Sequence, residues 1–380
     1  MKWIADQQSF DAALAQIARG GEFAIDTEAD SLHSYFDKVC LIQITAGGED
    51  FIIDPLAKID LKGLGPIFGD KAIRKVLHGA DYDLRILNRD FGFELRNLTD
   101  TMICAQLLGY EAIGLAALLQ RHFGMEVDKS HQRADWAQRP LRPEMLAYAA
   151  NDTHHLLELA SILQGELEAL GRWEWALEEF ERLESIRFTP SADEEAWRKV
   201  KGCSRLERRA LAAVKRLHAW RDRVARELDR PPFKVLGNEA IIEIATQLPR
   251  SAEAMGSIKG LASWHTRKWG AELLSITEDV AGLPEHELPE KVATKPWLRD
   301  RELERTIESL KRVRDRIAAD LRIDAAILAP KHVLAAVAEL APGEARELDA
   351  IPAMRHWQKA ILGAPLLEAL AGRGKQGGRG

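Results

Sequence analysis

Hydrophobic positions recur in two different ways along this chain of 380 residues. Up to about residue 172, short apolar runs alternate with segments in which apolar residues recur every three or four positions. The first pattern is typical of strands and the second of helices. Beyond residue 172 only the helical spacing remains. The pattern therefore predicts an α/β domain, followed by all-helical domains.

The expected strands include the stretch 22–30 and residues 39–44, 51–53 and 74–78. Gly47 and Gly48 lie between the second and third of these strands, and such a pair is typical of a tight turn. We therefore expect the first three strands to form an antiparallel meander. Helical patterns then alternate with strands, which favours a mixed sheet flanked by helices. Pro143 opens what we predict to be one long helix that continues through Ala160.

The all-helical part contains an internal duplication. Arg221–Leu228 (RDRVAREL) matches Arg314–Leu321 (RDRIAADL), and two further blocks recur at an offset of about 92 or 93 residues. A steady offset over three blocks indicates two copies of one helical unit. The expected organisation is an α/β domain 1–171, a helical linker 172–203, a first helical domain 204–282, a linker 283–296, a second helical domain 297–370 and a disordered tail 371–380.

Composition narrows the class of protein. Hydrophobic residues make up 46% and charged residues 29%, values that describe a globular protein. The net charge of −6 means that any nucleic-acid-binding surface has to be local. Three widely spaced cysteines offer no disulfide framework. The cysteine usage fits a reducing compartment, and no apolar run reaches about 18 residues, so we expect a cytoplasmic protein without a membrane span. We expect a monomer, because each unit can cover its own core.

Candidate chemistry begins with two acidic residues on the first long strand. Asp26 and Glu28 are two positions apart, so their side chains point to the same face. The pair is either a solvated strand end or a set of oxygen ligands for a divalent cation. Asp83 follows a later strand-to-helix junction, beside the apolar face of its helix. Tyr148 and Asp152 are four positions apart on the predicted long helix, so they are neighbours.

These residues, in this order, resemble the three exonuclease motifs of the DEDD superfamily, in the branch that carries a tyrosine. The runs LHGADYDLRIL (77–87), LTDT (98–101) and RADW (133–136) resemble the ribonuclease D family, and the helical repeats resemble its HRDC domains. The resemblance implies a ribonuclease H-like fold and 3′-to-5′ hydrolysis of RNA. It also implies two Mg²⁺ or Mn²⁺ ions held by Asp26, Glu28, Asp83 and Asp152, with Tyr148 orienting the attacking water.

The implied partner is RNA with a free 3′ end, with transfer-RNA precursors as the implied substrate. We expect further substrate contacts from residues near the motifs: Leu32, His33, Lys129, Arg133, Trp136 and Arg139. Cationic side chains can bind phosphates, and an aromatic side chain beside them can stack on a base. The alternative for that loop is a buried Trp136 surrounded by solvated charges. A DNA exonuclease and a non-catalytic RNA-binding scaffold remain alternatives for the whole protein.

Overall fold

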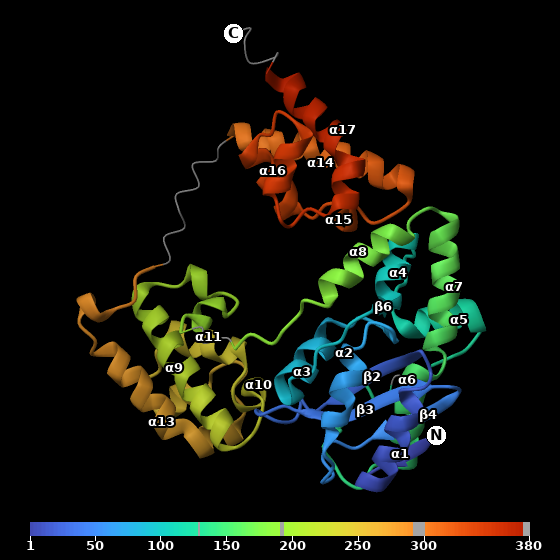
Figure 1. Ribbon diagram of the computed structural model, residues 1–380. Helices are drawn as coiled ribbons and strands as arrows, with labels where there is room; N and C mark the ends of the chain where they lie inside the picture. Colours follow the sequence, from blue (N-terminus) through green and yellow to red (C-terminus); the bar gives the residue numbers. More distant parts are fainter. Residues whose placement is uncertain (128–129, 191–193, 292–300, 375–380) are drawn as a thin grey trace. The chain divides into compact units, whose positions relative to one another are not determined.

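The computed structural model describes all residues except 128–129, 191–193, 292–300 and 375–380 (Figure 1). The chain divides into two compact units. The first contains Met1–Ala29, Val39–Phe188 and Arg299–Gly380, and the second contains Asp30–Lys38 and Thr189–Leu298. Both are therefore assembled from segments that are far apart in the sequence. Within the described residues, none of the helices combines enough length and hydrophobicity to span a bilayer.

The first unit is built on one mixed sheet. Its six strands are β1 (Lys2–Ile4), β2 (Glu22–Ala29), β3 (Val39–Ala46), β4 (Glu49–Ile53), β5 (Arg74–Leu77) and β6 (Leu98–Asp100), in the spatial order β1-β4-β3-β2-β5-β6. The predicted meander is confirmed, since β2 runs antiparallel to β3 and β3 to β4. The pairs β1–β4, β2–β5 and β5–β6 are parallel. Sequence analysis missed β6, because three residues are too short to display a period.

Eight α-helices of the first unit lie within the described part of residues 1–183, the stretch of the chain that contains the sheet. They are α1 (Gln7–Ile17), α2 (Leu64–Gly69), α3 (Asp81–Phe91), α4 (Thr101–Leu108), α5 (Leu115–Phe123), α6 (Pro143–His154), α7 (Leu156–Ala169) and α8 (Trp173–Leu183). The single long helix predicted from Pro143 is wrong, because the chain breaks at His155 between α6 and α7. The break turns the carboxyl end of α6 toward β4, where His154 pairs with Asp50.

Two hydrophobic clusters hold the helices on the sheet. The larger one gathers fully buried side chains of β2 to β5, such as Phe23, Ile25 and Phe51, against several helices. A smaller one packs Trp136 and α6 against Cys40, Leu41 and Ile52 of β3 and β4. Burying one large aliphatic side chain contributes about 1.5–3 kcal/mol. The second cluster therefore fixes α6, and with it Asp152, on the sheet.

The helical part consists of two copies of one five-element unit. The first contains α9 (Arg208–Glu227), α10 (Pro232–Val235), α11 (Asn238–Gln247), α12 (Ala252–Gly256) and α13 (Ser263–Ala281). The second contains α14 (Arg301–Leu321), α15 (Ala325–Leu328), α16 (Lys331–Leu340), a 3₁₀ helix (Ala345–Ala350) and α17 (His356–Gly374). Each element of the second copy begins 93 positions after its counterpart. The last residues of α17 lie in the stretch expected to be a disordered tail, and residues 375–380 of that tail lie outside the described residues.

Internal contacts repeat at the same spacing. The buried guanidinium of Arg221 donates to the carbonyl of Leu236 at 3.0 Å, and Arg314 donates to the carbonyl of Ala329 at 2.8 Å. Even a rare backbone conformation recurs, since Leu248 has φ 44° and its counterpart Ala341 has φ 46°. The duplication predicted from three sequence blocks therefore extends to side-chain contacts.

The loop between β2 and β3 belongs to the second unit. The hydroxyl of Tyr35 donates to Asp222 of α9 at 2.8 Å, and the backbone amides of Tyr35 and Phe36 donate to Asp229 at 2.9 and 3.0 Å. Arg226 lies over the Tyr35 ring. The loop that follows the Asp26–Glu28 strand is thus held by the first helical repeat.

Candidate active site

The acidic residues come from three elements that the sheet brings together. Asp26 and Glu28 lie near the end of β2, which has β3 on one side and β5 on the other. Asp83 lies in the first turn of α3, which follows β5. Asp152 lies near the end of α6, the helix held by the Trp136 cluster. Because parallel neighbours end at the same edge of a sheet, the end of β2 meets the helix that follows β5.

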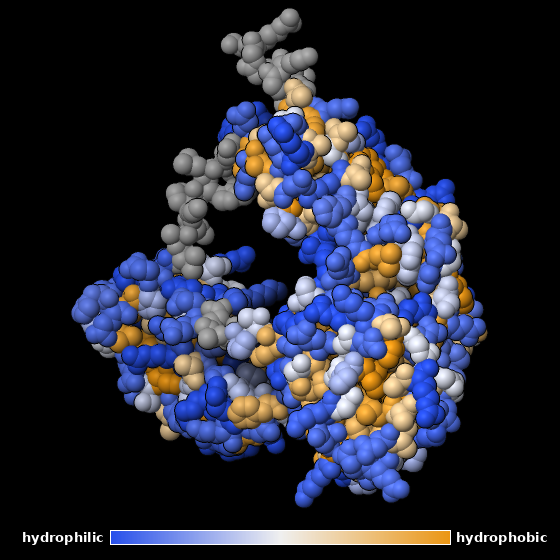
Figure 2. Space-filling model, in the orientation of Figure 1, coloured by the Kyte–Doolittle hydropathy of each residue, from blue (hydrophilic) through white to orange (hydrophobic). Residues whose placement is uncertain are grey.

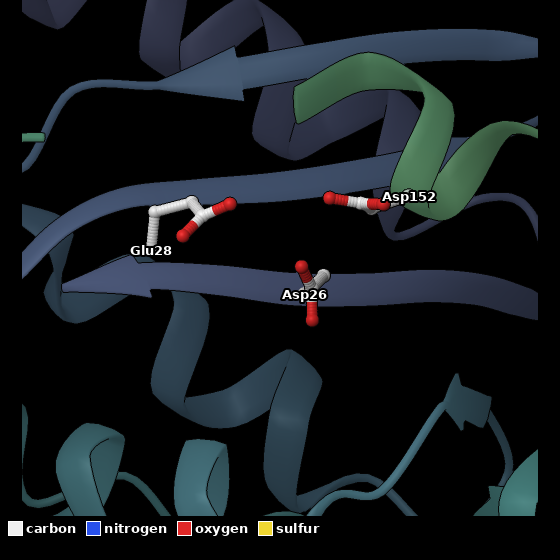
Figure 3. A group of neighbouring side chains, drawn as sticks. All are labelled: Asp26, Glu28 and Asp152. Atoms are coloured by element: carbon white, nitrogen blue, oxygen red, sulfur yellow. The ribbon is translucent and has the colours of Figure 1, made fainter. Parts of the chain in front are cut away.

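Three of the four carboxylates converge. Asp26, Glu28 and Asp152 each offer a ligand oxygen, and these atoms lie within 4.8 Å of one another. Figure 3 shows the three carboxylates pointing toward a common space, with Asp152 arriving from α6. Each side chain is a hard oxygen donor of the kind that Mg²⁺ and Mn²⁺ bind. The donor set therefore fits a divalent cation.

Asp83 lies beside this group without belonging to the same 4.8 Å set. Its side chain is 7% exposed and accepts a hydrogen bond from the hydroxyl of Thr27. It is close enough for its negative charge to raise the pKa of both Asp26 and Glu28. Thr27 was not singled out from the sequence, since a threonine between two acidic residues carries no distinctive signal.

The electrostatics of the cluster favour cation binding. Burial, with added repulsion from Asp83, Asp152 and Glu28, raises the pKa of Asp26 well above its usual range. Burial and the neighbouring carboxylates raise the pKa of Glu28 to about 9. Burial raises the pKa of Asp152 to about 7 and that of Asp83 to about 6. Buried carboxylates that repel one another are stabilised in the charged form by a bound cation.

Tyr148 lies beside the acidic group. Burial and the charges of Asp152, Glu28 and Asp26 raise the pKa of its hydroxyl, which therefore stays protonated at neutral pH, and the hydroxyl is hydrogen-bonded to Gln132. Its ring packs near Trp136, with centroids 6.0 Å apart. The phenol is thus a neutral hydrogen-bonding group held next to three carboxylates.

A buried polar network fixes the end of α6 that carries Asp152. The hydroxyl of Thr45 on β3 is 2.7 Å from that of Thr153 and donates to Asp50 at 2.8 Å. Asp50 also pairs with Nδ1 of His154 at 3.0 Å. Sequence reasoning missed this network, because its partners are more than a hundred residues apart and none of them belongs to a motif.

The residues predicted to contact substrate lie in different parts of the structure. Trp136 is 1% exposed and packs against β3 and β4, as in the buried alternative considered above. Arg139 donates to Asp54 at 2.7 and 2.9 Å and to the carbonyls of Trp136 and Cys40. Arg133 is exposed on the same loop.

Three other predicted contacts lie elsewhere. Leu32 and His33 are on the loop held by the second unit, where Leu32 is 40% exposed. Lys129 lies outside the described residues. A substrate role for Leu32, His33, Arg133, Trp136 and Arg139 therefore stays a prediction, and the hydrogen bonds of Arg139 support a role in holding its loop.

The mixed sheet and its acidic site are those of a 3′-to-5′ exonuclease domain, and comparison with known families agrees. The sequence pattern of the 3′-5′ exonuclease family matches residues 1–168. The pattern of the HRDC domain matches residues 210–277 and 304–370, one match in each helical repeat.

Similar proteins whose matches extend beyond the exonuclease domain identify the family. The ribonuclease D of Sphingobium indicum is 33% identical over 299 residues, which cover 78% of this chain and 77% of that protein. The ribonuclease D of Pseudomonas paraeruginosa is 30% identical over 97% of both chains. The crystal structure of Escherichia coli RNase D, described as an exoribonuclease involved in structured RNA processing, has a TM-score of 0.72 and 28% identity, and the match covers 97% of this chain and 98% of that one. The chain therefore belongs to the ribonuclease D family of 3′-to-5′ exoribonucleases.

Proposed function

We propose that this protein removes nucleotides from RNA 3′ ends by hydrolysis that depends on two divalent ions, Mg²⁺ or Mn²⁺. The observation that carries the proposal is the convergence of Asp26, Glu28 and Asp152 within 4.8 Å, in a partly buried site where each carboxylate has a raised pKa. When bound, the two ions would stabilise negative charge on the attacking and leaving oxygens.

The four carboxylates would divide the two ions among them. Asp26, in the middle of the group, would serve both ions. Glu28 and Asp152 would hold the ion on the side of the attacking water. Asp83 would hold the ion on the side of the leaving oxygen, through water, because its carboxylate already accepts the Thr27 hydroxyl.

Tyr148 would act on the attacking water. Its protonated hydroxyl lies beside Asp152 and Glu28, where it can form a hydrogen bond with a water molecule and keep that molecule in line with the phosphate. A neutral phenol is a poor ligand for Mg²⁺, so we assign it to orientation. The packing of its ring near Trp136 limits the directions in which the hydroxyl can point.

The natural substrates we propose are precursors of transfer RNA, cleaved by a monomer in the cytoplasm. Family membership supports an RNA substrate, and three buried cysteines that form no disulfide fit a reducing compartment. Matched RNA and DNA oligonucleotides would separate this function from DNA hydrolysis. Light scattering on the purified protein tests the monomer.

The decisive experiment replaces Asp26 with asparagine. Hydrolysis of a 5′-labelled RNA should be lost, while the fold is retained. Mg²⁺ should raise the melting temperature of the wild-type protein, because it binds only the folded state, and should have little effect on Asp26→Asn. In EDTA the variant should melt at the same temperature or higher, because a carboxyl whose pKa is raised by folding lowers the stability of the folded state at neutral pH, and the amide does not. Normal hydrolysis by the variant in Mg²⁺ would refute the assignment.

A further inference from the structure

Trp264, the second residue of α13, exposes a large aromatic surface. Its side chain is 42% exposed. The ring of His265 stacks on it with centroids 3.7 Å apart, and Trp269 lies 5.4 Å away. Isolated apolar residues are common on protein surfaces and need no explanation by themselves. Figure 2 shows mostly hydrophilic residues on the visible face, with hydrophobic ones in small separate areas. Trp264 differs from an ordinary exposed residue because the equivalent residue of the second repeat packs against another helix, and its contacts show what this position can bind.

The counterpart is Trp357, 93 positions later and also the second residue of its helix, α17. It is only 6% exposed, because α8 of the same unit packs on it. The indole rings of Trp357 and Trp175 are stacked, with centroids 4.9 Å apart and an angle of 11° between their planes. This position of the repeat therefore binds a flat aromatic ring.

The same position also binds anionic groups. The indole Nε1 of Trp357 donates to Glu179 at 3.1 Å. The backbone amides of His356 and Trp357 donate to Glu178 at 2.7 and 3.1 Å. One flat ring and two carboxylates of α8 are thus held by the indole, the first turn of α17 and Arg355, which donates to Glu179 at 2.9 and 3.1 Å and has Ala262 as its counterpart in the first repeat. Those carboxylates occupy places where other anions with oxygen acceptors, such as phosphates, would be held by the same donors.

In the first repeat this position is open. Within the described ranges, the ring of Trp264 stacks only on residues of its own helix, His265 and Trp269. Exposed cations lie close to it in the sequence or the fold. Arg267 follows on α13, and Lys234 precedes Val235, whose backbone carbonyl is hydrogen-bonded to His265. The surroundings therefore favour an anionic ligand that contains an aromatic ring.

We propose that Trp264 and the first turn of α13 form a binding subsite for one nucleotide of the RNA substrate. A base would stack on the free face of the indole, as Trp175 does on Trp357. Its phosphate would lie near the indole Nε1 and the positive charges of Arg267 and Lys234. A nucleotide supplies both the ring and the anion, and RNA is what this family hydrolyses. The proposal rests on family membership and does not depend on the two-ion mechanism.

The test measures RNA binding by the full-length protein in EDTA, so that the RNA stays intact. Trp264→Ala should weaken the binding of a fluorescein-labelled single-stranded RNA by about 5- to 150-fold, because stacking of a base on an aromatic residue contributes about 1–3 kcal/mol. Trp264→Phe should lose less. Leu228→Ala is the matched control, since Leu228 is also exposed in the second unit, at 40%, and lacks the aromatic ring. Melting temperatures would verify that each variant folds.

A second measurement locates the stacked base. Abasic nucleotides are placed one at a time along the RNA. At one position, loss of the base should weaken RNA binding by the wild-type protein and should not weaken binding by Trp264→Ala any further. Binding by Trp264→Ala within twofold of wild type would overturn the proposal, and so would an equal loss in Leu228→Ala. So would an outcome in which Trp264→Ala leaves RNA binding intact but abolishes binding of a peptide with the acidic α8 sequence. Failure of the two-ion mechanism is distinguishable, since it would affect hydrolysis without affecting binding in EDTA.

Discussion

At the scale of single residues, the exonuclease site concentrates negative charge in partly buried positions. A buried carboxylate next to others costs folding free energy unless it is protonated or paired. The raised pKa of Glu28, about 9, expresses that cost. A site that is unfavourable without a ligand and is relieved by a cation couples binding to stability. The acidic group is thus a place where stability is given up for function.

Tyr148→Phe tests the orienting role of the phenol. The change keeps the ring that packs near Trp136 and removes only the hydroxyl. We expect kcat to fall by about 10²- to 10⁴-fold, the usual range for loss of a group that acts on a proton in the transition state. RNA affinity and the stabilisation by Mg²⁺ should hardly change. Loss of the Mg²⁺-dependent rise in melting temperature would instead make Tyr148 part of the cation site.

Lys75 supports a prediction about pH. The side chain is fully buried on β5 and its Nζ donates to the carbonyl of Ile73 at 2.8 Å. Burial lowers its pKa from 10.5 to about 8. Between pH 8 and 10.5 the unfolded chain therefore binds more protons than the folded one, so this group makes stability rise with pH. Urea unfolding at pH 7, 9 and 10.5 should show wild type gaining stability relative to Lys75→Met; parallel curves would mean that Lys75 titrates normally.

At the scale of secondary structure, the sequence predicted most elements because their apolar spacing is set by burial on the sheet. Phe23 and Ile25 alternate with Asp26 and Glu28, so the strand and its two carboxylates could be inferred together. The break at His155 could not be inferred, because the structural partner of His154, the last residue of α6, is Asp50 of β4. Such a long-range contact overrides local helix propensity and leaves no trace in the helix's own apolar pattern.

The loop before α6 offers a prediction at this scale, because two arginines on it have different surroundings. Arg139→Gln removes the pair with Asp54 and should lower the free energy of unfolding by about 1–3 kcal/mol. The slope of log K for RNA binding against log salt should stay unchanged. Arg133→Gln is the comparison, since a phosphate contact there would reduce that slope by about 1. A reduced slope with normal stability in Arg139→Gln would mean that Arg139 contacts RNA.

At the scale of the whole molecule, the order of domains along the chain does not reveal how the chain is grouped in space. The duplication could be read from the sequence because both copies keep their core positions, including Arg221 and Arg314. The grouping could not, because it depends on surface residues that differ between the copies. Arg355 joins the second repeat to α8 through Glu179, whereas Ala262 stands in the first repeat where Arg355 stands in the second.

The attachment of the second repeat to α8 can be measured by a double-mutant cycle. Arg355 donates to both carboxylate oxygens of Glu179 at 2.9 and 3.1 Å, and both side chains are largely buried. Glu179→Ala and Arg355→Ala should therefore show a coupling of about 0.5–3 kcal/mol in urea unfolding. Asp81 and Arg85 provide the control cycle, because this exposed pair on α3 should couple by only about 0.3–0.5 kcal/mol. Coupling no larger than the control would mean that the second repeat does not stay docked on α8 in solution. Coupling above it would make that repeat a part of the nuclease body, which leaves the first repeat as the one with a free Trp surface for RNA.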